Sequence, residues 1–558
     1  MRNNSELEDE QLRQIEKTSN KNLSKQNESM ITLRKPKIKK RINRWPWGIT
    51  LISLGAFILT ATIWYIINIG DVSFEQLLFH IKVPIEAAGF NPLKSFGLQA
   101  VIAALAAAVL YYIFAKFFLM KYRFRVRNIL LVTGSIFMLI IIIGLGQLGF
   151  FKYVKNIFNE SSAWEEYYTE PGNVELIFPE EKRNVIYIVL ESIETTYADK
   201  ANGGAMQQNL IPNLTELALD DENISFSHSK RMGGARQFGP LGWTAASLVG
   251  QMGGIPLKLP IDDPNAFDTI NGEYLPGSLM IGDILKEEGY YLEMMMGSSA
   301  RFASRDDLYK MHGDFVMTDY SNLAKNGYIP IVDGKYEFDF WGINDKKLFT
   351  IAKERLIKIS QQDEPFFFSI LTVDTHFPDG YQYEDRERLH HTSYGNSIMW
   401  SDRDVVEFIK WCQTCSFAEN TTIVLIGDHL SMDKTFFEGI PRDYQRRMYN
   451  VILNSAQDLP QERQYQRLFT VMDFFPTCLA AMGVEIEGER LAYGTNLYSD
   501  EATLYEIMGE AEFSDMLDSH SSFYNDKFLY NIVPTTRPSY APTQRPSYAP
   551  TQTSSYGS

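Results

Sequence analysis

The chain has 558 residues, which is enough for a large core and more than one region. Its formal net charge of −16 and pI near 5.1 exclude a general nucleic-acid-binding protein, so we expect no nucleic acid among its partners. Three cysteines are too few for a disulfide framework.

Residues 1–44 are polar and end in a dense cationic run from Arg34 to Arg44. Few apolar residues precede that run, so the segment cannot bury enough surface to fold by itself. We expect a disordered basic tail on the cytoplasmic side of a membrane.

Residues 45–150 are predicted to form a transmembrane region with helices at about 45–69, 98–120 and 129–150. A helix needs about 20 apolar residues to cross the hydrocarbon core of about 30 Å, and each run is that long. A buried helix of a soluble domain is the alternative for any one run. Three runs in succession favour a membrane anchor.

Basic residues predict the orientation of these helices. The clusters Arg34–Arg44 and Lys121–Arg127 belong on the cytoplasmic side, because positively charged loops stay inside. Residues 71–95 are poor in Lys and Arg and belong outside. Three crossings from an inside start place everything after Phe151 outside the cytoplasm. We therefore expect a multi-pass protein of the inner (cytoplasmic) membrane with an extracytoplasmic main domain.

After a juxtamembrane linker at 151–183, residues 184–530 alternate buried strands with helices. The expected strands are Val185–Leu190, Tyr291–Met296, Phe366–Val373 and Thr422–Ile426. The expected helices include Leu279–Glu288, Lys346–Gln361 and Asp402–Cys412. This alternation predicts an α/β domain with a mostly parallel sheet flanked by helices.

Residues 531–558 form the last predicted region. They contain the octad Arg-Pro-Ser-Tyr-Ala-Pro-Thr-Gln twice, starting at 537 and at 545. A segment so rich in Pro, Ser and Thr cannot bury a core, so we expect a low-complexity disordered tail.

Polar side chains follow the apolar strands at their carboxyl ends. Glu191 ends the first strand, Asp374-Thr-His376 follows another, and Asp428-His429 ends a third. Open α/β sheets bind ligands at this edge, and two carboxylates with one imidazole suit Mn²⁺, Zn²⁺ or Mg²⁺. The simpler alternatives are a solvated acidic loop at Glu191 and a helix N-cap at Asp428 beside a surface histidine.

A glycine-framed segment, Gly239–Ser247, contains the candidate nucleophile. Thr244 precedes an expected helix at Ala245–Gln251, and a helix N-terminus favours anionic groups. A threonine hydroxyl next to a metal could be deprotonated and attack phosphorus. The alternative is that Thr244 is only a helix cap.

Together these motifs resemble those of phosphoglycerol transferases of the lipoteichoic acid synthase and periplasmic-glucan type, within the alkaline phosphatase and sulfatase superfamily. The resemblance runs from about Asn184 to Asn450. The motifs that carry it are Asn184-Val-Ile-Tyr-Ile-Val-Leu-Glu191-Ser, Gly242-Trp-Thr244, Gly253-Gly-Ile-Pro-Leu, Leu275-Pro-Gly, Asp374-Thr-His376-Phe-Pro and Gly427-Asp428-His429. The sequence around Gly242-Trp-Thr244 is more similar to that of the enzyme that decorates osmoregulated periplasmic glucans than to that of polymerising lipoteichoic acid synthases.

The resemblance implies roles for six residues. It implies four metal ligands, usually for Mn²⁺ and with Mg²⁺ or Zn²⁺ as alternatives: Glu191, Thr244, Asp428 and His429. Thr244 matches the nucleophile, which forms a glycerophospho-threonine intermediate. Arg305 matches an arginine that holds the substrate phosphate, and His376 matches a residue that contacts the phosphoglycerol group.

The implied reaction moves glycerol phosphate from phosphatidylglycerol, the lipid donor in the membrane, to a glycan or polymer acceptor. One departure concerns the pocket: lipoteichoic acid synthases carry a Trp two residues before the matched arginine and a His nine residues before it. This chain has Ala303 and Met296 at those positions, so its glycerol end is expected to differ.

Three other functions remain open at this stage. Two are enzymes on the same fold: a phosphoethanolamine transferase, or a phosphodiesterase or sulfatase-like hydrolase. Sulfatases need Cys or Ser in a Cys/Ser-X-Pro-X-Arg context, which Trp243-Thr244-Ala245 does not offer. The third is a catalytically silent membrane-anchored protein that binds a lipid or glycan.

Overall fold

The computed structural model describes residues 10–22, 45–68, 74, 76, 78, 91–114, 116–117, 126–258, 273–332 and 334–532. Residues 10–22 form an exposed helix. The rest of the predicted basic tail and nearly all of the predicted C-terminal tail lie outside the described residues. The chain forms two compact units, Met1–Ala56 with Ala103–Leu139 and Phe57–Ile102 with Ile140–Ser558.

Apolar helices precede the sheet. They are α2 (Trp45–Asn68), α4 (Asn91–Phe114) and α5 (Val126–Gln147). By length and composition, α2 and α4 can each cross a membrane. Only 17% of the most apolar stretch of α2, Trp47–Trp64, is buried, and only 6% of that of α4, Gly97–Phe114. A third crossing is present if α5 counts with α6 (Phe150–Ile157), which is bent from it by 70°. Such exposed apolar surface does not fit buried helices of a soluble core.

The second apolar helix differs in position from its prediction, which began at Leu98. The helix begins at Asn91 and ends at Phe114. Lys94 interrupts the apolar run in the sequence, but a helical backbone continues through a charged residue near its end.

The central sheet has six strands in the order β4-β3-β7-β2-β8-β9. Their bounds are β4 (Val316–Thr318), β3 (Tyr291–Met296), β7 (Phe366–Leu371), β2 (Asn184–Leu190), β8 (Thr421–Gly427) and β9 (Asn450–Leu453). All neighbours are parallel except β9, which pairs antiparallel with β8. The predicted α/β class with a mostly parallel sheet is confirmed.

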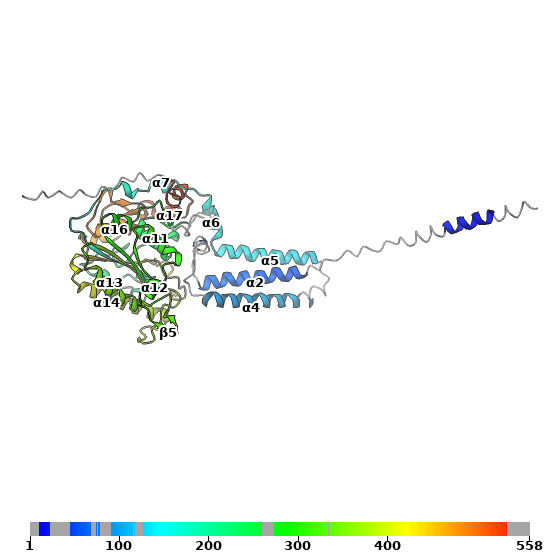
Figure 1. Cartoon of the computed structure of the whole chain (residues 1–558), viewed down its shortest axis with the longest axis horizontal. Helices are drawn as coiled ribbons and strands as arrows, with labels where there is room; N and C mark the ends of the chain where they lie inside the picture. The colour runs from blue at the N-terminus through cyan, green and yellow to red at the C-terminus, as the bar shows by residue number, and fades with distance from the viewer. Residues whose placement is uncertain are drawn as a thin grey trace, which may run out of the picture. The chain divides into compact units, whose positions relative to one another are not determined.

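Both faces of the sheet are covered, which explains why β2 is buried and free of charged residues from Val185 to Leu190. Its odd-numbered residues from Val185 to Val189 pack into the core of α9 (Thr244–Gly253), α10 (Ile281–Glu287) and α16 (Phe474–Ala481). Its even-numbered residues from Ile186 to Leu190 pack into the core of α8 (Pro212–Leu219), α13 (Asp345–Ile359) and α14 (Ser393–Gln413). Figure 1 shows α13 and α14 together on one side and α16 on the other.

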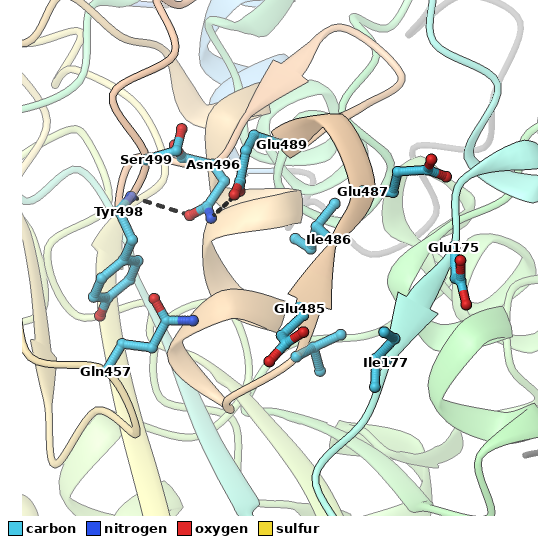
Figure 2. Close-up of a pocket in the computed structure, with 11 residues that line it drawn as sticks. Glu175, Ile177, Gln457, Glu485, Ile486, Glu487, Glu489, Asn496, Tyr498 and Ser499 are labelled. Carbon is cyan, nitrogen blue, oxygen red and sulfur yellow. Dashed lines mark hydrogen bonds between the residues drawn. The ribbon is translucent and has the colours of Figure 1, made fainter.

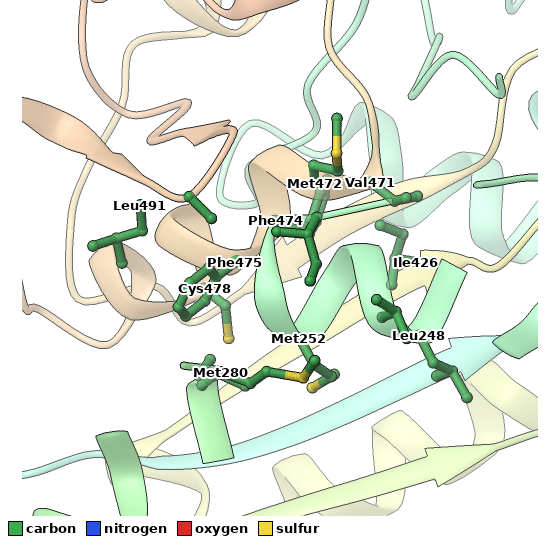
Figure 3. Close-up of a cluster of buried hydrophobic side chains, with 14 of the residues drawn as sticks. Leu248, Met252, Met280, Ile426, Val471, Met472, Phe474, Phe475, Cys478 and Leu491 are labelled. Atoms are coloured by element: carbon green, nitrogen blue, oxygen red, sulfur yellow. The ribbon is translucent and has the colours of Figure 1, made fainter. Parts of the chain in front are cut away.

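The core on the α9 side is rich in sulfur and aromatic side chains. Leu248 and Met252 of α9 belong to the same buried cluster as Phe474, Phe475 and Cys478 of α16 (Figure 3). This packing fixes α9, and therefore fixes the position of Thr244 at its start.

One predicted helix is longer than expected. α14 begins at Ser393 instead of Asp402. The Thr392 hydroxyl caps it by accepting a hydrogen bond from the Gly395 N–H at 3.0 Å. Gly395 and Asn396 are weak helix formers, so the sequence did not reveal this first part of the helix.

Shorter elements complete the part of the chain that carries the sheet, here called the sheet domain. The helices are α7 (Ala163–Glu166), α11 (Arg305–Met311), α12 (Tyr320–Lys325), α15 (Gln461–Gln464), α17 (Leu504–Asp518) and α18 (Ser522–Tyr524). Three antiparallel pairs join β1 (Leu176–Ile177) to β10 (Glu485–Ile486), β5 (Ile331–Val332) to β6 (Lys335–Tyr336), and β11 (Arg490–Leu491) to β12 (Gly494–Thr495).

Gly427, the last residue of β8, gives a test of this packing. A Cβ there would lie 2.1 Å from the Ile193 carbonyl oxygen, so Gly427→Ala forces the backbone apart. We expect the free energy of unfolding to fall by about 3 kcal/mol. Gly172→Ala is the matched control, because its Cβ would meet no atom closer than 3.9 Å. Equal denaturation midpoints for the two variants would contradict the packing.

Candidate active site

Two carboxylates lie side by side at the carboxyl ends of adjacent parallel strands. Leu190 of β2 is in register with Gly427 of β8, so the next residues, Glu191 and Asp428, meet at one edge of the sheet. The Ser192 N–H donates to Asp428 Oδ1 at 2.8 Å, and the Asp428 N–H donates to the Leu190 carbonyl at 3.1 Å. Both carboxylates are buried.

His429 completes a compact group of potential metal ligands. Its Nδ1 lies 3.0 Å from the Leu430 carbonyl, an acceptor that assigns the proton to Nδ1 and leaves the Nε2 lone pair free. Nε2 lies 3.4 Å from Glu191 Oε1 and 3.5 Å from Asp428 Oδ2. One ligand atom from each of the three buried residues lies within 4.8 Å of the others.

Thr244 faces this group from the first residue of α9. Its Oγ1 lies 3.4 Å from His429 Nε2 and 3.5 Å from Glu191 Oε2. The N-cap position belongs to Trp243, and no side chain caps the helix. The Thr244 hydroxyl therefore points to the acidic group and does not cap α9, contrary to the simpler alternative from the sequence.

The electrostatics of this cluster favour a bound cation. Burial, followed by the charge of Glu191, raises the pKa of Asp428 to about 7. Burial lowers the pKa of His429, but the charges of Asp428 and Glu191 outweigh it and the net pKa is raised. Within the described part of the chain, Asp428 Oδ2 is buried with no hydrogen-bond partner. Two carboxylates, one imidazole and one hydroxyl fit Mn²⁺, Zn²⁺ or Mg²⁺.

Arg305 lies buried at the start of α11 with its guanidinium held in place. Its Nε donates to the Phe302 carbonyl at 3.1 Å, and its Nη2 donates to Ser298 Oγ at 3.1 Å and to the Ser299 carbonyl at 2.7 Å. Burial lowers the pKa of Arg305 to about 10, although the charge of Glu191 opposes that shift. The side chain thus stays cationic at neutral pH and is preorganised for an anion.

His376 follows β7 and is neutral. Burial is the main cause that lowers its pKa to about 4. Its Nδ1 lies 2.6 Å from the Phe377 carbonyl, which assigns the proton to Nδ1 and leaves Nε2 as an acceptor. The ring of Trp341 lies 4.5 Å from the His376 ring, centroid to centroid.

Trp341 is a site residue that the sequence did not predict. Ala303 and Met296, the two positions at which the sequence departs from the resemblance to lipoteichoic acid synthases, are both buried. Trp341 comes from the segment before α13, and its ring also contacts Phe302 at 5.8 Å between centroids. No motif marks this tryptophan, because only the fold brings it to His376.

Two buried acids fix the loop that carries His376. Asp345, at the start of α13, accepts hydrogen bonds from the N–H groups of Val373 and Asp374, both at 2.9 Å. Asp374 in turn accepts from the Asp345 N–H at 3.0 Å and from the Tyr383 hydroxyl at 2.6 Å. Burial raises the pKa of Asp374 to about 7 and also raises that of Asp345.

An ion pair between buried Glu194 and partly buried Arg446 joins the loops that carry the candidate metal ligands. Arg446 Nε donates to Glu194 Oε2 at 2.7 Å, and the Ser431 N–H donates to Glu194 Oε1 at 3.2 Å. Arg446 Nη2 also donates to the Ser431 carbonyl at 2.8 Å. The contacts of Glu194 thus connect the segment after β2 to the segment after β8.

A surface pocket lies elsewhere, beside β1 and β10, and contains none of the predicted site residues (Figure 2). Its lining includes Glu175, Glu485, Glu487 and Glu489. Four carboxylates repel a phosphate group, so this pocket does not suit an anionic substrate.

The sequence and structure are similar to those of known proteins. Residues 268–484 match the sulfatase family, a stretch that includes Arg305, His376, Asp428 and His429 but not Glu191 or Thr244. Phosphoglycerol transferase I of Xanthomonas campestris pv. campestris is 25% identical over 470 residues, which cover 81% of this chain and 61% of that protein. Its namesake in Salmonella paratyphi B is 30% identical over 325 residues, covering 57% and 39%.

Two solved structures are also similar to parts of this chain. The lipooligosaccharide phosphoethanolamine transferase A (EptA) of Neisseria meningitidis has a TM-score of 0.45 at 16% identity, covering 78% of this chain and 84% of that one. The lipoteichoic acid synthase LtaP of Listeria monocytogenes has a TM-score of 0.42 at 16% identity, covering 59% and 79%.

These matches confirm the resemblance that the motifs indicated: the chain is similar in sequence to phosphoglycerol transferases, and part of it matches the sulfatase family. It spans less than two thirds of the length of the curated relatives it matches, at 61% and 39% of the two proteins above.

Asp345 and Asp374, the two buried acids that fix the His376 loop, predict a pH dependence of stability. An acid whose pKa is raised on folding binds more protons in the folded chain, so stability falls as pH rises from about 4 to about 7. Asp374→Asn removes one titrating group and keeps an oxygen acceptor. We expect it to reduce this fall by on the order of 3 kcal/mol, measured by chemical denaturation across that range.

Asp385→Asn, at an exposed carboxylate, is the control and should keep the wild-type profile. A profile for Asp374→Asn that matches wild type would show that Asp374 does not titrate as the structure requires.

Proposed function

We propose that this chain is a membrane-anchored, metal-dependent phosphoglycerol transferase that moves glycerol phosphate from phosphatidylglycerol to a glycan or polymer acceptor. The observation that carries the proposal is the position of the Thr244 hydroxyl. It lies 3.4 Å from His429 Nε2 and 3.5 Å from Glu191 Oε2, at the start of a helix. A hydroxyl in such a place is poised to act as a nucleophile toward a phosphodiester.

Four residues would hold the metal: Glu191, Thr244, Asp428 and His429. Mn²⁺ is the ion we favour, and Mg²⁺ and Zn²⁺ also suit these ligands. When bound, the metal supplies Lewis acidity that lowers the pKa of the hydroxyl and offsets the phosphate charge.

The residues of the chain define the first half of the reaction. Thr244 Oγ1 forms a bond to phosphorus as the bond from phosphorus to the diacylglycerol oxygen breaks. Arg305, whose guanidinium is fixed by Ser298 and Ser299, stabilises the charge on the phosphoryl oxygens. The Thr244 hydroxyl gives its proton to water, and the departing diacylglycerol oxygen takes a proton from water, because His376 is neutral and holds its one proton on Nδ1.

The second half transfers the phosphoglycerol group. An acceptor hydroxyl attacks phosphorus and displaces Thr244. His376 Nε2, the free lone pair of that ring, can accept a hydrogen bond from the incoming hydroxyl or from the glycerol group. Trp341 holds the His376 ring in place from one side.

The membrane anchor would give the reaction its lipid donor. We propose a cytoplasmic tail at 1–44, an anchor at 45–150, a linker at 151–183, an extracytoplasmic catalytic domain at 184–530 and a C-terminal tail at 531–558. The basic clusters around Arg34–Arg44 and Lys121–Arg127 support this orientation in the inner membrane. Anchoring keeps the site close to lipid head groups and raises their effective concentration.

Replacing the nucleophile tests the proposal directly. Thr244→Ala removes the hydroxyl and should lower transfer of radiolabelled glycerol phosphate from phosphatidylglycerol by at least about 1000-fold. Thr244→Ser keeps a hydroxyl at this position and should retain measurable transfer. Wild-type turnover by Thr244→Ala would exclude Thr244 as the nucleophile.

The metal assignment is tested by metal content. Asp428→Asn removes a buried negative charge and should lower bound Mn²⁺ at equilibrium by about 10-fold or more, measured by elemental analysis of the purified full chain. Asp433→Asn is the matched control, because Asp433 is also buried and its Oδ1 accepts from the N–H groups of Thr435 and Phe436. It should keep wild-type metal content. Wild-type chain without any bound divalent cation would favour a silent lipid- or glycan-binding protein.

A further inference from the structure

The hairpin of β5 and β6 exposes large apolar side chains on both of its faces. The exposed fractions are 64% for Ile331, 55% for Val332, 44% for Tyr336 and 47% for Phe338. Ile331 pairs with Tyr336 and Val332 pairs with Lys335, so neighbouring pairs point to opposite faces. Figure 1 shows β5 at the rim of the sheet domain, beyond α12. A hairpin on a soluble surface usually packs one face against the core.

The base of the hairpin is fixed, so the fold itself holds these side chains in solvent. The Glu337 N–H donates to the Pro330 carbonyl at 2.9 Å, and the Tyr320 hydroxyl donates to the Glu337 carbonyl at 3.0 Å. The Tyr320 ring meets the Phe338 ring edge-on at 5.4 Å between centroids.

The hairpin continues directly into the candidate active site. Only Asp339 and Phe340 separate Phe338 from Trp341, whose ring lies 4.5 Å from that of His376. The next residue, Gly342, pairs with Ser298, the residue whose hydroxyl accepts a hydrogen bond from Arg305. The apolar hairpin therefore lies at the border of the site that would hold the phosphate.

A lipid surface is within reach of the compact unit that carries the hairpin. In that unit α6, which follows the apolar helix α5, is attached to the sheet domain: Lys152 forms an ion pair with Asp518 at 2.7 Å, and the His520 N–H donates to the Asn156 carbonyl at 3.1 Å. The domain is thus joined to helices that can cross a membrane, without a long linker.

Basic side chains offset part of the acidic charge around the hairpin. Lys347 forms ion pairs with Glu337 at 2.7 Å and with Asp339 at 3.1 Å, so its single positive charge is shared by the two acidic groups at the base. Lys335 is exposed beside Tyr336. Aromatic and aliphatic side chains next to a lysine are typical of segments that lie at a membrane interface.

We propose that the exposed apolar side chains of this hairpin, Ile331, Val332, Tyr336 and Phe338, dock on the lipid surface of the membrane in which the chain is anchored. Docking places the border of the site at the level of the phospholipid head groups, so that a donor can enter without leaving the bilayer. The identity of that donor rests on the proposed function, whereas docking itself does not.

A depth measurement tests docking without catalysis. Val332→Cys, in a Cys415→Ser background, is labelled with an environment-sensitive fluorophore in the full chain, since the other cysteines, Cys412 and Cys478, are buried. The labelled chain is placed in nanodiscs of phosphatidylglycerol and phosphatidylcholine that contain spin-labelled lipid. We expect quenching at least about 3-fold stronger than for Gln362→Cys, an exposed position that precedes the amino end of β7. Equal quenching at both positions would overturn the proposal.

An activity measurement tests its consequence. The double variant Ile331→Ser, Val332→Ser should transfer about 10-fold more slowly from phosphatidylglycerol in bilayers, and at the wild-type rate from a short-chain phosphatidylglycerol dissolved as monomers. Ile177→Ser is the matched control, since Ile177 on β1 is 47% exposed, and it should change neither rate.

An equal loss of transfer rate with both donors would mean that the hairpin supports the structure of the site, and would overturn docking. An unchanged transfer rate with both donors would also overturn docking. A wild-type dimer that the double variant converts to a monomer would identify a second copy as the occupant and also overturn it. If wild-type chain uses neither donor, the proposed function fails, while the quenching measurement still decides the docking.

Discussion

Two buried carboxylates, Glu191 and Asp428, impose the constraint on which the rest of the site depends. Adjacent parallel strands end in register, so the two carboxylates lie next to each other. Burial raises the pKa of Asp428. Like charges in a buried site are costly unless a cation joins them. In the proposed function, the neighbouring His429 nitrogen and Thr244 hydroxyl would supply the remaining ligands of such a cation.

The surrounding structure holds this cluster at fixed distances. Glu194 and Arg446 connect the segments after β2 and β8, and Asp345 connects the His376 loop to the start of α13. Glu194 and Asp345 are buried charged groups with hydrogen-bond partners, and Arg446 is partly buried. Such groups contribute less to overall stability than to a defined geometry, which a phosphoryl-transfer site requires.

The sequence predicted what local patterns encode. Four apolar runs located β2, β3, β7 and β8, because each strand is buried on both faces. The motifs also indicated the residues that the structure brings together around Glu191. Trp341 and the Glu194–Arg446 pair were not predictable, since their partners are far away in the chain. The Asn91 start of α4 and the Ser393 start of α14 were missed because Lys94 and Gly395 interrupt the local pattern.

The central claim is that Thr244 becomes covalently linked to the transferred group. The most direct measurement is peptide mass spectrometry of the full chain after brief incubation with phosphatidylglycerol and Mn²⁺. A glycerophosphate adduct on Thr244 is the predicted result, and it should be absent from Thr244→Ala. An adduct on another residue, or transfer that proceeds at the wild-type rate with no adduct under rapid quenching, would contradict the proposed mechanism.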